Sequence, residues 1–200
     1  MQQQKVNFSP VYRDYVSRLN TTLEKFDWSK LDILASDLLD CWETGRQVFI
    51  AGNGGSAGNA NHIVNDFVYP VSKQMGSGLR MHSLAANQAV MTCLANDEGY
   101  DSIFSYQLAV LSNPGDVLIV LSGSGNSENI ISVLEEARRR DVTSYAFLGY
   151  SGGKARELAD VPLHFDVDDM QIAEDTQLIS FHMLCQVLYS LKSEFLEGVQ

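Results

Sequence analysis

The chain has few cysteines and no long apolar run, and both scarcities exclude classes of protein. Its three cysteines, Cys41, Cys93 and Cys185, are an odd number without CxxC spacing, which indicates a reducing compartment and no disulfide framework. No apolar stretch approaches the ~20 residues that span a bilayer. Residues 1–5 lack the apolar segment of a signal peptide. We therefore expect a cytoplasmic protein without a membrane partner.

Basic residues are also scarce. The 200 residues include 14 Lys and Arg against 25 Asp and Glu, a net charge of −11 at pH 7. Because nucleic-acid phosphates are bound by clustered Lys and Arg, this balance argues against a nucleic-acid partner. An anionic ligand must instead be held by local dipoles and hydrogen bonds, against the charge of the whole protein.

The pattern of apolar residues predicts a single α/β domain over residues 1–200, with helices at 9–44 and an α/β core at about 45–196. Short apolar runs predict buried parallel strands, at 47–51, 79–85, 117–121, 144–149 and 161–167. Helices are expected between them, with a loop at 69–78 and a closing helix at 173–196. This alternation predicts a parallel sheet with helices on both faces. The N-terminal helix lacks a partner in the pattern and is expected to pack on the closing helix or on another subunit.

Two loops rich in glycine and serine directly follow the strands at 47–51 and 117–121. Doubly wound sheets bind ligands at this position, and a helix N-terminus offers unpaired N–H groups to a phosphate. The loops add the hydroxyl groups of Ser56, Ser122, Ser124 and Ser127. They predict a phosphate site without Lys or Arg, although Ser and Gly also serve simply as turns and helix caps.

Neither loop has the pattern of a nucleotide site. The first reads GxGGSxG where a dinucleotide site needs GxGxxG, and the second lacks the lysine of a P-loop. We therefore expect no nucleotide cofactor.

Four motifs together resemble the sugar isomerase (SIS) domain family: Gly52-Asn53-Gly54-Gly55-Ser56, Ala95-Asn96-Asp97, Gly115-Asp116-Val117-Leu118 and Ser122-Gly123-Ser124-Gly125-Asn126-Ser127. Within it the chain is most similar to phosphoheptose isomerases, which convert sedoheptulose 7-phosphate to an aldoheptose 7-phosphate used for lipopolysaccharide. The resemblance implies a flavodoxin-like three-layer α/β/α sandwich with a parallel sheet. It also implies a homotetramer whose active sites are built from neighbouring subunits.

The resemblance further assigns the substrate site. It implies that Ser122, Ser124 and Ser127 hold the phosphate. It implies that Asn53, Ser56 and Asp97 line the sugar, and the same site is expected to include Gly54, Asn96, Gly123, Asn126 and Glu174.

His62 and Asp66 lie four residues apart on an expected helix and so share one face. Related enzymes place a His and a Glu at this spacing, and a Gln and a His eight apart near the C-terminus. The resemblance implies that these four bind zinc and that the Glu and second His transfer protons. The matching residues here are His62, Asp66, Glu174 and His182.

Two of these residues depart from the family pattern. Asp66 is one methylene shorter than Glu, and Glu174 carries a carboxylate instead of an amide. Eight helical residues span about 12 Å, so Glu174 and His182 cannot reach one ion from a single regular helix. Either Glu174 precedes the helix or the two come from different subunits. The alternatives are that His62 is a cap or a solvated residue, that His182 is a core histidine and that Asp66 is a surface carboxylate.

The leading hypothesis is a ketose–aldose isomerase that converts sedoheptulose 7-phosphate to D-glycero-D-manno-heptose 7-phosphate. Asp66 would act as the base at carbon and His182 as the acid/base at oxygen. One alternative is a non-catalytic SIS module that binds a sugar phosphate or a protein such as a replication initiator. Another is an isomerase of a different phosphosugar, because Val68-Tyr69-Pro70 replaces the family's Thr-Gly-Arg.

Overall fold

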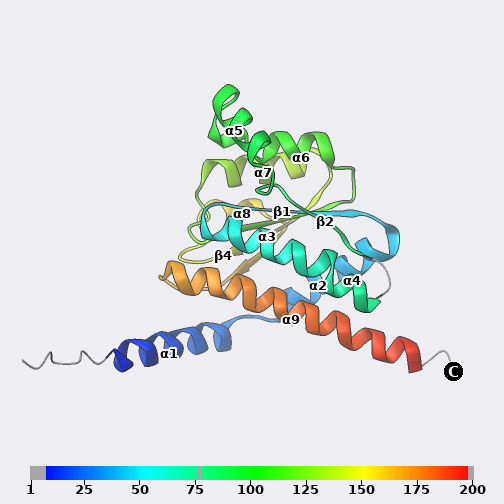
Figure 1. Ribbon diagram of the computed structural model, residues 1–200. Coiled ribbons are helices and arrows are strands. Elements are labelled where there is room, and N and C mark those ends of the chain that lie inside the picture. Colours follow the sequence, from blue (N-terminus) through cyan, green and yellow to red (C-terminus); the bar gives the residue numbers. More distant parts are fainter. Residues whose placement is uncertain (1–7, 76–77, 198–200) are drawn as a thin grey trace, which may run out of the picture.

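A five-stranded parallel sheet lies between two layers of helices in the computed structural model, which describes residues 8–75 and 78–197 (Figure 1). The strands are β1 (Gln47–Gly52), β2 (Arg80–Ser83), β3 (Val117–Ser122), β4 (Thr143–Leu148) and β5 (Val161–His164). Their order across the sheet is β2-β1-β3-β4-β5. This is the flavodoxin-like order, so the expected sandwich is confirmed.

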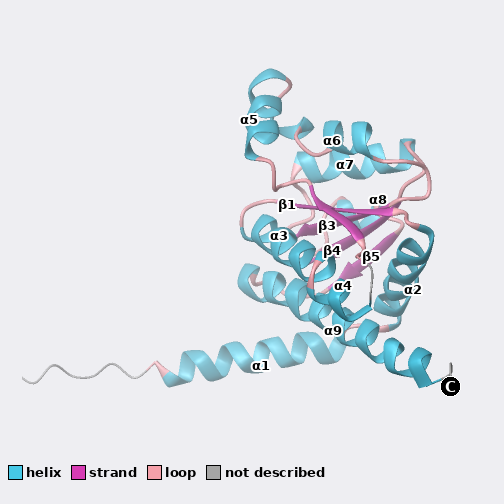
Figure 2. Cartoon of the chain, turned by 45° about the vertical axis from the view of Figure 1, so that its right-hand side comes forward, coloured by secondary structure: helices cyan, strands magenta, loops and turns pink. Residues whose placement is uncertain are grey.

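The helices divide into two layers because successive strand side chains point to opposite faces. Val48 and Ile50 belong to the core on one face, which is covered by α2 (Ser29–Thr44), α3 (Gly55–Val68), α4 (Pro70–Met75) and α9 (Met170–Glu197). Phe49 and Ala51 belong to the core on the other face, which is covered by α6 (Ser105–Leu111), α7 (Glu128–Arg139) and α8 (Ala155–Leu158). The helix α5 (Gln88–Asp97) lies beside that second layer (Figure 2). The 3₁₀ turn Tyr100–Ser102 contacts α5, α6 and α7.

The order of the strands reverses between β1 and β3, which pair directly with Gly52 opposite Leu121. Both strands therefore end at the same edge of the sheet. The loops after β1 and β3 meet there, at the point where doubly wound sheets bind ligands. The two loops to which the sequence assigns a phosphate site therefore lie side by side.

The expected helical segment 9–44 is two helices, α1 (Ser9–Lys25) and α2, separated at residues 26–28. Phe26 leaves the helix to stack on Phe165 with ring centroids 4.0 Å apart. The Asp27 carboxylate accepts hydrogen bonds from the N–H and hydroxyl groups of Ser29, which starts the second helix. At its far end, α2 stops at Gly45 with a φ of 74°, a left-handed C-cap that glycine adopts readily.

The expected loop 69–78 is also wrong in part, because residues 70–75 form α4. Proline fits the first turn of a helix, where its missing N–H has no partner to lose, so Pro70 starts this helix. The closing helix begins at Met170, three residues earlier than expected. Among the described residues, no helix has the length and apolar character needed to cross a membrane.

Candidate active site

The loops after β1 and β3 enclose a cavity of about 250 Å³ together with the start of α9. Its walls are Asn53, Gly54, Gly55, Ser56, Leu121, Ser122, Gly123, Ser124, Ser127, Met170 and Glu174. The helices α3 and α7 both begin at this cavity. Two sets of unpaired N–H groups and two positive helix ends therefore lie beside one small polar space.

The loop conformations present donors to this cavity. Gly54 has a φ of 54°, a left-handed value that glycine adopts without steric cost, and it turns the chain directly into α3. Ser122 Oγ accepts from the Gly125 N–H at 3.1 Å, and Ser124 Oγ accepts from the Asn126 N–H at 3.3 Å. Since a hydroxyl group both accepts and donates, each of these serines keeps its proton for an anion in the cavity.

Asn126 does not line the cavity, contrary to the expectation that it contacts substrate. Its Nδ2 donates to Ser124 O at 3.1 Å, and its Oδ1 accepts from Lys154 N at 3.1 Å. The Nδ2 bond therefore stabilises the loop itself, and the Oδ1 bond holds the loop against the chain that follows β4.

Glu174 does line the cavity, with its carboxylate against the backbone of Gly55. It lies inside α9, eight residues before His182 in the same continuous helix. The alternative that Glu174 precedes the helix is therefore wrong, and the helical rise from Glu174 to His182 is about 12 Å. Within one chain, Glu174 belongs to the phosphate end of the site and not to the histidine cluster.

His62, Asp66 and His182 form that cluster, further along α3 and α9. The two Nε2 atoms are 3.2 Å apart, and Asp66 Oδ2 lies 3.4 Å from His62 and 3.5 Å from His182. Asp66 reaches both rings despite its shorter side chain. The side chain of His182 is 53% exposed, so its interpretation as a core histidine is wrong.

The spacing of these three donor atoms suits a tetrahedral metal. Four ligands about 2.0–2.1 Å from a zinc ion lie about 3.3 Å from one another. The sides of the donor triangle, 3.2, 3.4 and 3.5 Å, are close to that value. Two imidazoles and one carboxylate with a fourth position open is a known arrangement in catalytic zinc sites.

Gln177 connects the cavity to the cluster. It is buried on α9, its Nε2 donates to Ser56 Oγ at 3.1 Å, and its Oε1 accepts from Asn59 at 2.9 Å. These bonds fix α9 on α3 between the two parts of the site. No periodic pattern or motif in the sequence indicated Gln177, because its partners are on another helix.

Comparison with known proteins identifies the family. Residues 11–149 match the family model described as SIS domain. The chain belongs to the SIS domain family. It is 30% identical over 177 residues to a probable phosphoheptose isomerase from Thermoplasma volcanium. These matched residues cover 88% of this chain and 90% of that protein.

Solved structures give the same result for this SIS domain. A phosphoheptose isomerase from Francisella tularensis has a TM-score of 0.84 and 26% identity, covering 92% of this chain and 96% of that one. A phosphoheptose isomerase from Neisseria gonorrhoeae has a TM-score of 0.83 and 28% identity, covering 91% of this chain and 98% of that one.

A second cavity of the SIS domain, about 580 Å³, adjoins the first and shares Asn53 and Ser127 with it. Asn53 and Asn129 form a reciprocal amide pair, with both N···O distances 2.8 Å. The Tyr100 hydroxyl donates to Asn53 Oδ1 at 3.0 Å. With two bonds at Oδ1 and one from Nδ2, Asn53 has one N–H left to donate to a ligand. Sequence reasoning missed Tyr100 and Asn129, although both lie within four residues of a quoted motif.

Asn96 and Asp97 are separate from both of these cavities in the single chain. They are exposed at the end of α5, where Asn96 Nδ2 donates to Asp97 Oδ1 at 2.6 Å. The Cys93 thiol donates to the other Asp97 oxygen at 3.4 Å. The expected contact of Asn96 and Asp97 with the sugar is therefore not made within one chain.

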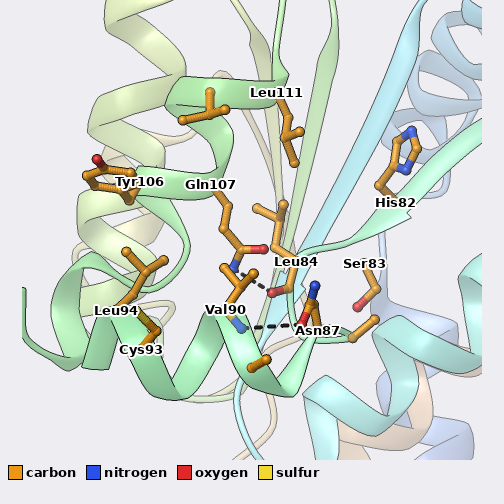
Figure 3. Close-up of a pocket in the computed structure, with 13 residues that line it drawn as sticks. His82, Ser83, Leu84, Asn87, Val90, Cys93, Leu94, Tyr106, Gln107 and Leu111 are labelled. Atoms are coloured by element: carbon orange, nitrogen blue, oxygen red, sulfur yellow. Dashed lines mark hydrogen bonds between the residues drawn. The ribbon is translucent and has the colours of Figure 1, made fainter. Parts of the chain in front are cut away.

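A third cavity, about 670 Å³, lies between β2, α5 and α6 (Figure 3). Its walls are mainly apolar and include Leu84, Val90, Leu94 and Leu111. Gln107 Nε2 donates to Leu84 O at 2.9 Å and holds α6 against the loop after β2. This apolar space lacks the convergent donors of the loop cavity, which remains the candidate phosphate site.

Proposed function

We propose that the chain is a ketose–aldose isomerase that converts sedoheptulose 7-phosphate to D-glycero-D-manno-heptose 7-phosphate. The observation that carries the proposal is the pairing of a cavity rich in N–H and hydroxyl donors with a His–Asp–His cluster on the same two helices. The names of the similar proteins support the same substrate.

The phosphate is bound by the loop after β3. Ser122, Ser124 and Ser127 line the cavity at the start of α7, where the helix dipole and N–H groups favour an anion. Asn53 donates its remaining N–H to a sugar oxygen. The bound phosphate does not require Lys or Arg, which fits the net charge of −11.

The spacing between cavity and cluster suits a sugar phosphate of this size. The six residues from Ser56 to His62 rise about 9 Å along α3. The single bonds that separate phosphorus from C1 in a heptose phosphate span roughly 10 Å when extended. A phosphate held by the loop therefore allows the sugar's C1 and C2 to reach the cluster.

The cluster transfers the protons of the isomerisation. Asp66 takes a proton from the carbon beside the carbonyl group and returns it to the neighbouring carbon, through an enediol. His182 moves the proton between the two oxygens. Asn65 donates to Asp66 Oδ1 at 3.2 Å and holds Oδ2 toward the two histidines, so Oδ1 keeps a lone pair that can take the proton.

We further propose that His62, Asp66 and His182 bind one zinc ion, and that any contribution from Glu174 comes from a neighbouring subunit. A bound zinc ion would polarise the substrate oxygens and so acidify the carbon that loses its proton. The two imidazoles supply neutral nitrogen ligands, and the carboxylate lowers the charge of the site.

We also propose a cytoplasmic homotetramer. Its support is the apolar stripe on α1, where Phe8, Val11, Tyr12 and Val16 are between 54% and 65% exposed. A surface of this kind is typical of a contact between proteins. A second subunit would also supply the site residues that one chain leaves distant, Asp97 among them.

The test is turnover of sedoheptulose 7-phosphate by purified protein, with added zinc and with a chelator. We expect an aldoheptose 7-phosphate as product, loss of activity with chelator, and recovery with zinc. Asp66→Asn should abolish turnover without changing the melting temperature by more than a few degrees, and full activity of this variant would refute the assigned base.

Other outcomes distinguish the alternatives. Turnover of a different phosphosugar in a parallel panel would assign another isomerase. Stabilisation by sugar phosphate without turnover of any substrate would favour a binding module.

A further inference from the structure

The first turn of α9 forms one wall of the phosphate cavity. A Cβ atom built on Gly123 would lie 2.5 Å from Sδ of Met170, so this side chain rests directly on the loop after β3. One turn later, the Glu174 carboxylate rests on Gly55 of the other loop. The position of this turn therefore sets the width of the cavity.

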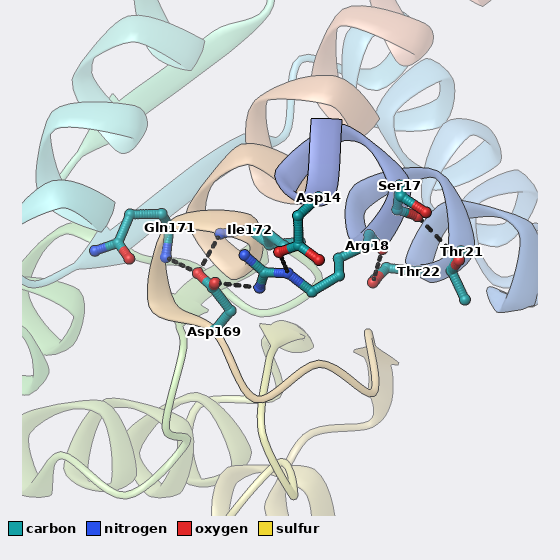
Figure 4. Close-up of polar contacts among 8 residues, drawn as sticks. All are labelled: Asp14, Ser17, Arg18, Thr21, Thr22, Asp169, Gln171 and Ile172. Carbon is teal, nitrogen blue, oxygen red and sulfur yellow. Dashed lines mark hydrogen bonds and ion pairs between the residues drawn. The ribbon is translucent and has the colours of Figure 1, made fainter. Parts of the chain in front are cut away.

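Asp169 fixes the start of that turn. Its Oδ1 accepts from the N–H groups of Gln171 at 3.0 Å and Ile172 at 3.1 Å, as an N-cap residue does. Its Oδ2 accepts from Arg18 Nη1 at 2.5 Å (Figure 4). Arg18 lowers the pKa of the Asp169 carboxyl below its ordinary value through this hydrogen bond.

Arg18 comes from α1, which lies outside the α/β/α body along the start of α9 (Figures 1 and 2). A second bond joins the same two helices, because the Tyr15 hydroxyl donates to Asp175 Oδ2 at 2.6 Å. Burial and the Asp175 carboxylate raise the pKa of Tyr15 to about 12, so this hydroxyl keeps its proton. Asp169 and Asp175 flank Met170 and Glu174 in sequence, so α1 is attached on both sides of the cavity wall.

We propose that Arg18 and Tyr15 are positioning residues for the phosphate cavity, acting through Asp169 and Asp175 on the first turn of α9. The inference rests on the proposed function, because it assigns these residues to the same sugar-phosphate site. Neither residue touches the cavity. Their effect is on binding and not on the proton-transfer cluster, which lies about two turns further along α9.

Three variants and a matched control test the proposal. Arg18→Met keeps the apolar stem and removes the charge. Asp169→Asn keeps an N-cap acceptor and removes the charge, and Tyr15→Phe removes one hydroxyl. Asp14→Asn is the control, because Asp14 also pairs with Arg18, at 2.9 Å, but contacts it within α1.

We expect the three variants to raise KM for sedoheptulose 7-phosphate by roughly two- to fivefold, the range of a partly exposed charged or polar contact. The value of kcat should change by less than about twofold. The Arg18→Met/Asp169→Asn double variant should match the single variants, because both remove one interaction. Asp14→Asn should match the wild type.

The second measurement does not need turnover. Inorganic phosphate should raise the Tm of the wild type more than that of Arg18→Met at the same concentration. If the wild type is stabilised by phosphate but does not isomerise the sugar, the proposed function fails while this comparison still tests the positioning role. Equal KM and equal phosphate stabilisation in wild type and variants would refute the inference. A lower Tm of the variants without a change in either binding measurement would also refute it. A wild type that phosphate does not stabilise would refute it as well.

Discussion

Tyr100→Phe isolates the hydrogen bond that orients Asn53. In the wild type, Asn53 Oδ1 accepts from Tyr100 at 3.0 Å and from Asn129 at 2.8 Å. Removing the hydroxyl leaves the ring in place and frees one acceptor position on Asn53. A neutral hydrogen bond contributes about 0.5–1.5 kcal/mol, and Tyr100 is 58% exposed, so we expect the lower half of this range.

That loss corresponds to a rise of roughly two- to fivefold in KM for the phosphosugar, since 1.4 kcal/mol is a factor of ten. The same energy lowers Tm by about 1–4 °C in a chain of this size. Steady-state kinetics and thermal unfolding measure the two quantities separately. Tyr106→Phe is the matched control, because Tyr106 is 53% exposed and lines the apolar cavity instead. An unchanged KM in Tyr100→Phe, with Tm also unchanged, would refute the reasoning.

Two further predictions concern stability. Phe181→Ala should lower the free energy of unfolding by about 3–5 kcal/mol in denaturant titrations, because Phe181 is buried between Phe67 and Phe147, whereas the exposed Val187→Ala should cost far less. Asp169 has a folded-state pKa below its ordinary value of 3.8. Its contribution to the free energy of unfolding is therefore fully present above pH 3.8, and it is lost as the pH falls through the lower folded-state pKa. The difference in Tm between wild type and Asp169→Asn should therefore shrink under acid conditions, and a constant difference from pH 7 to pH 2 would contradict this origin.

Local patterns predicted the parts of the fold that local physics decides. The buried strands β1 and β3 appear as short apolar runs because both faces of a parallel sheet are covered. Gly45 ends α2 in the left-handed conformation that is common for glycine at a helix C-terminus. The break at residues 26–28 was missed because it depends on Phe26 stacking with Phe165, which is distant in sequence.

The candidate site, like the fold, was predictable only where local sequence determines it. The His62–Asp66 pair follows from helical spacing, and the two loops follow from their places after strands. The contact of His182 with that pair depends on how α9 packs on α3, and only the family resemblance indicated it in advance. Arg18 could not be found, because its partner Asp169 is 151 residues away.

The structure gives Glu174 a different place from the one that the family pattern implies. The family pattern placed it with zinc, and helical rise already excluded a shared ion with His182 on one regular helix. The structure puts its carboxylate on Gly55, at the positive N-terminal end of α3, where a carboxylate is favoured by the helix dipole. Because the Glu174 carboxylate already lies at this end of α3, the N-terminus of α7 is the better place for the substrate phosphate. On the zinc proposal, His62, Asp66 and His182 are therefore the three ligands within one chain, and the fourth position is open to substrate or to a second subunit.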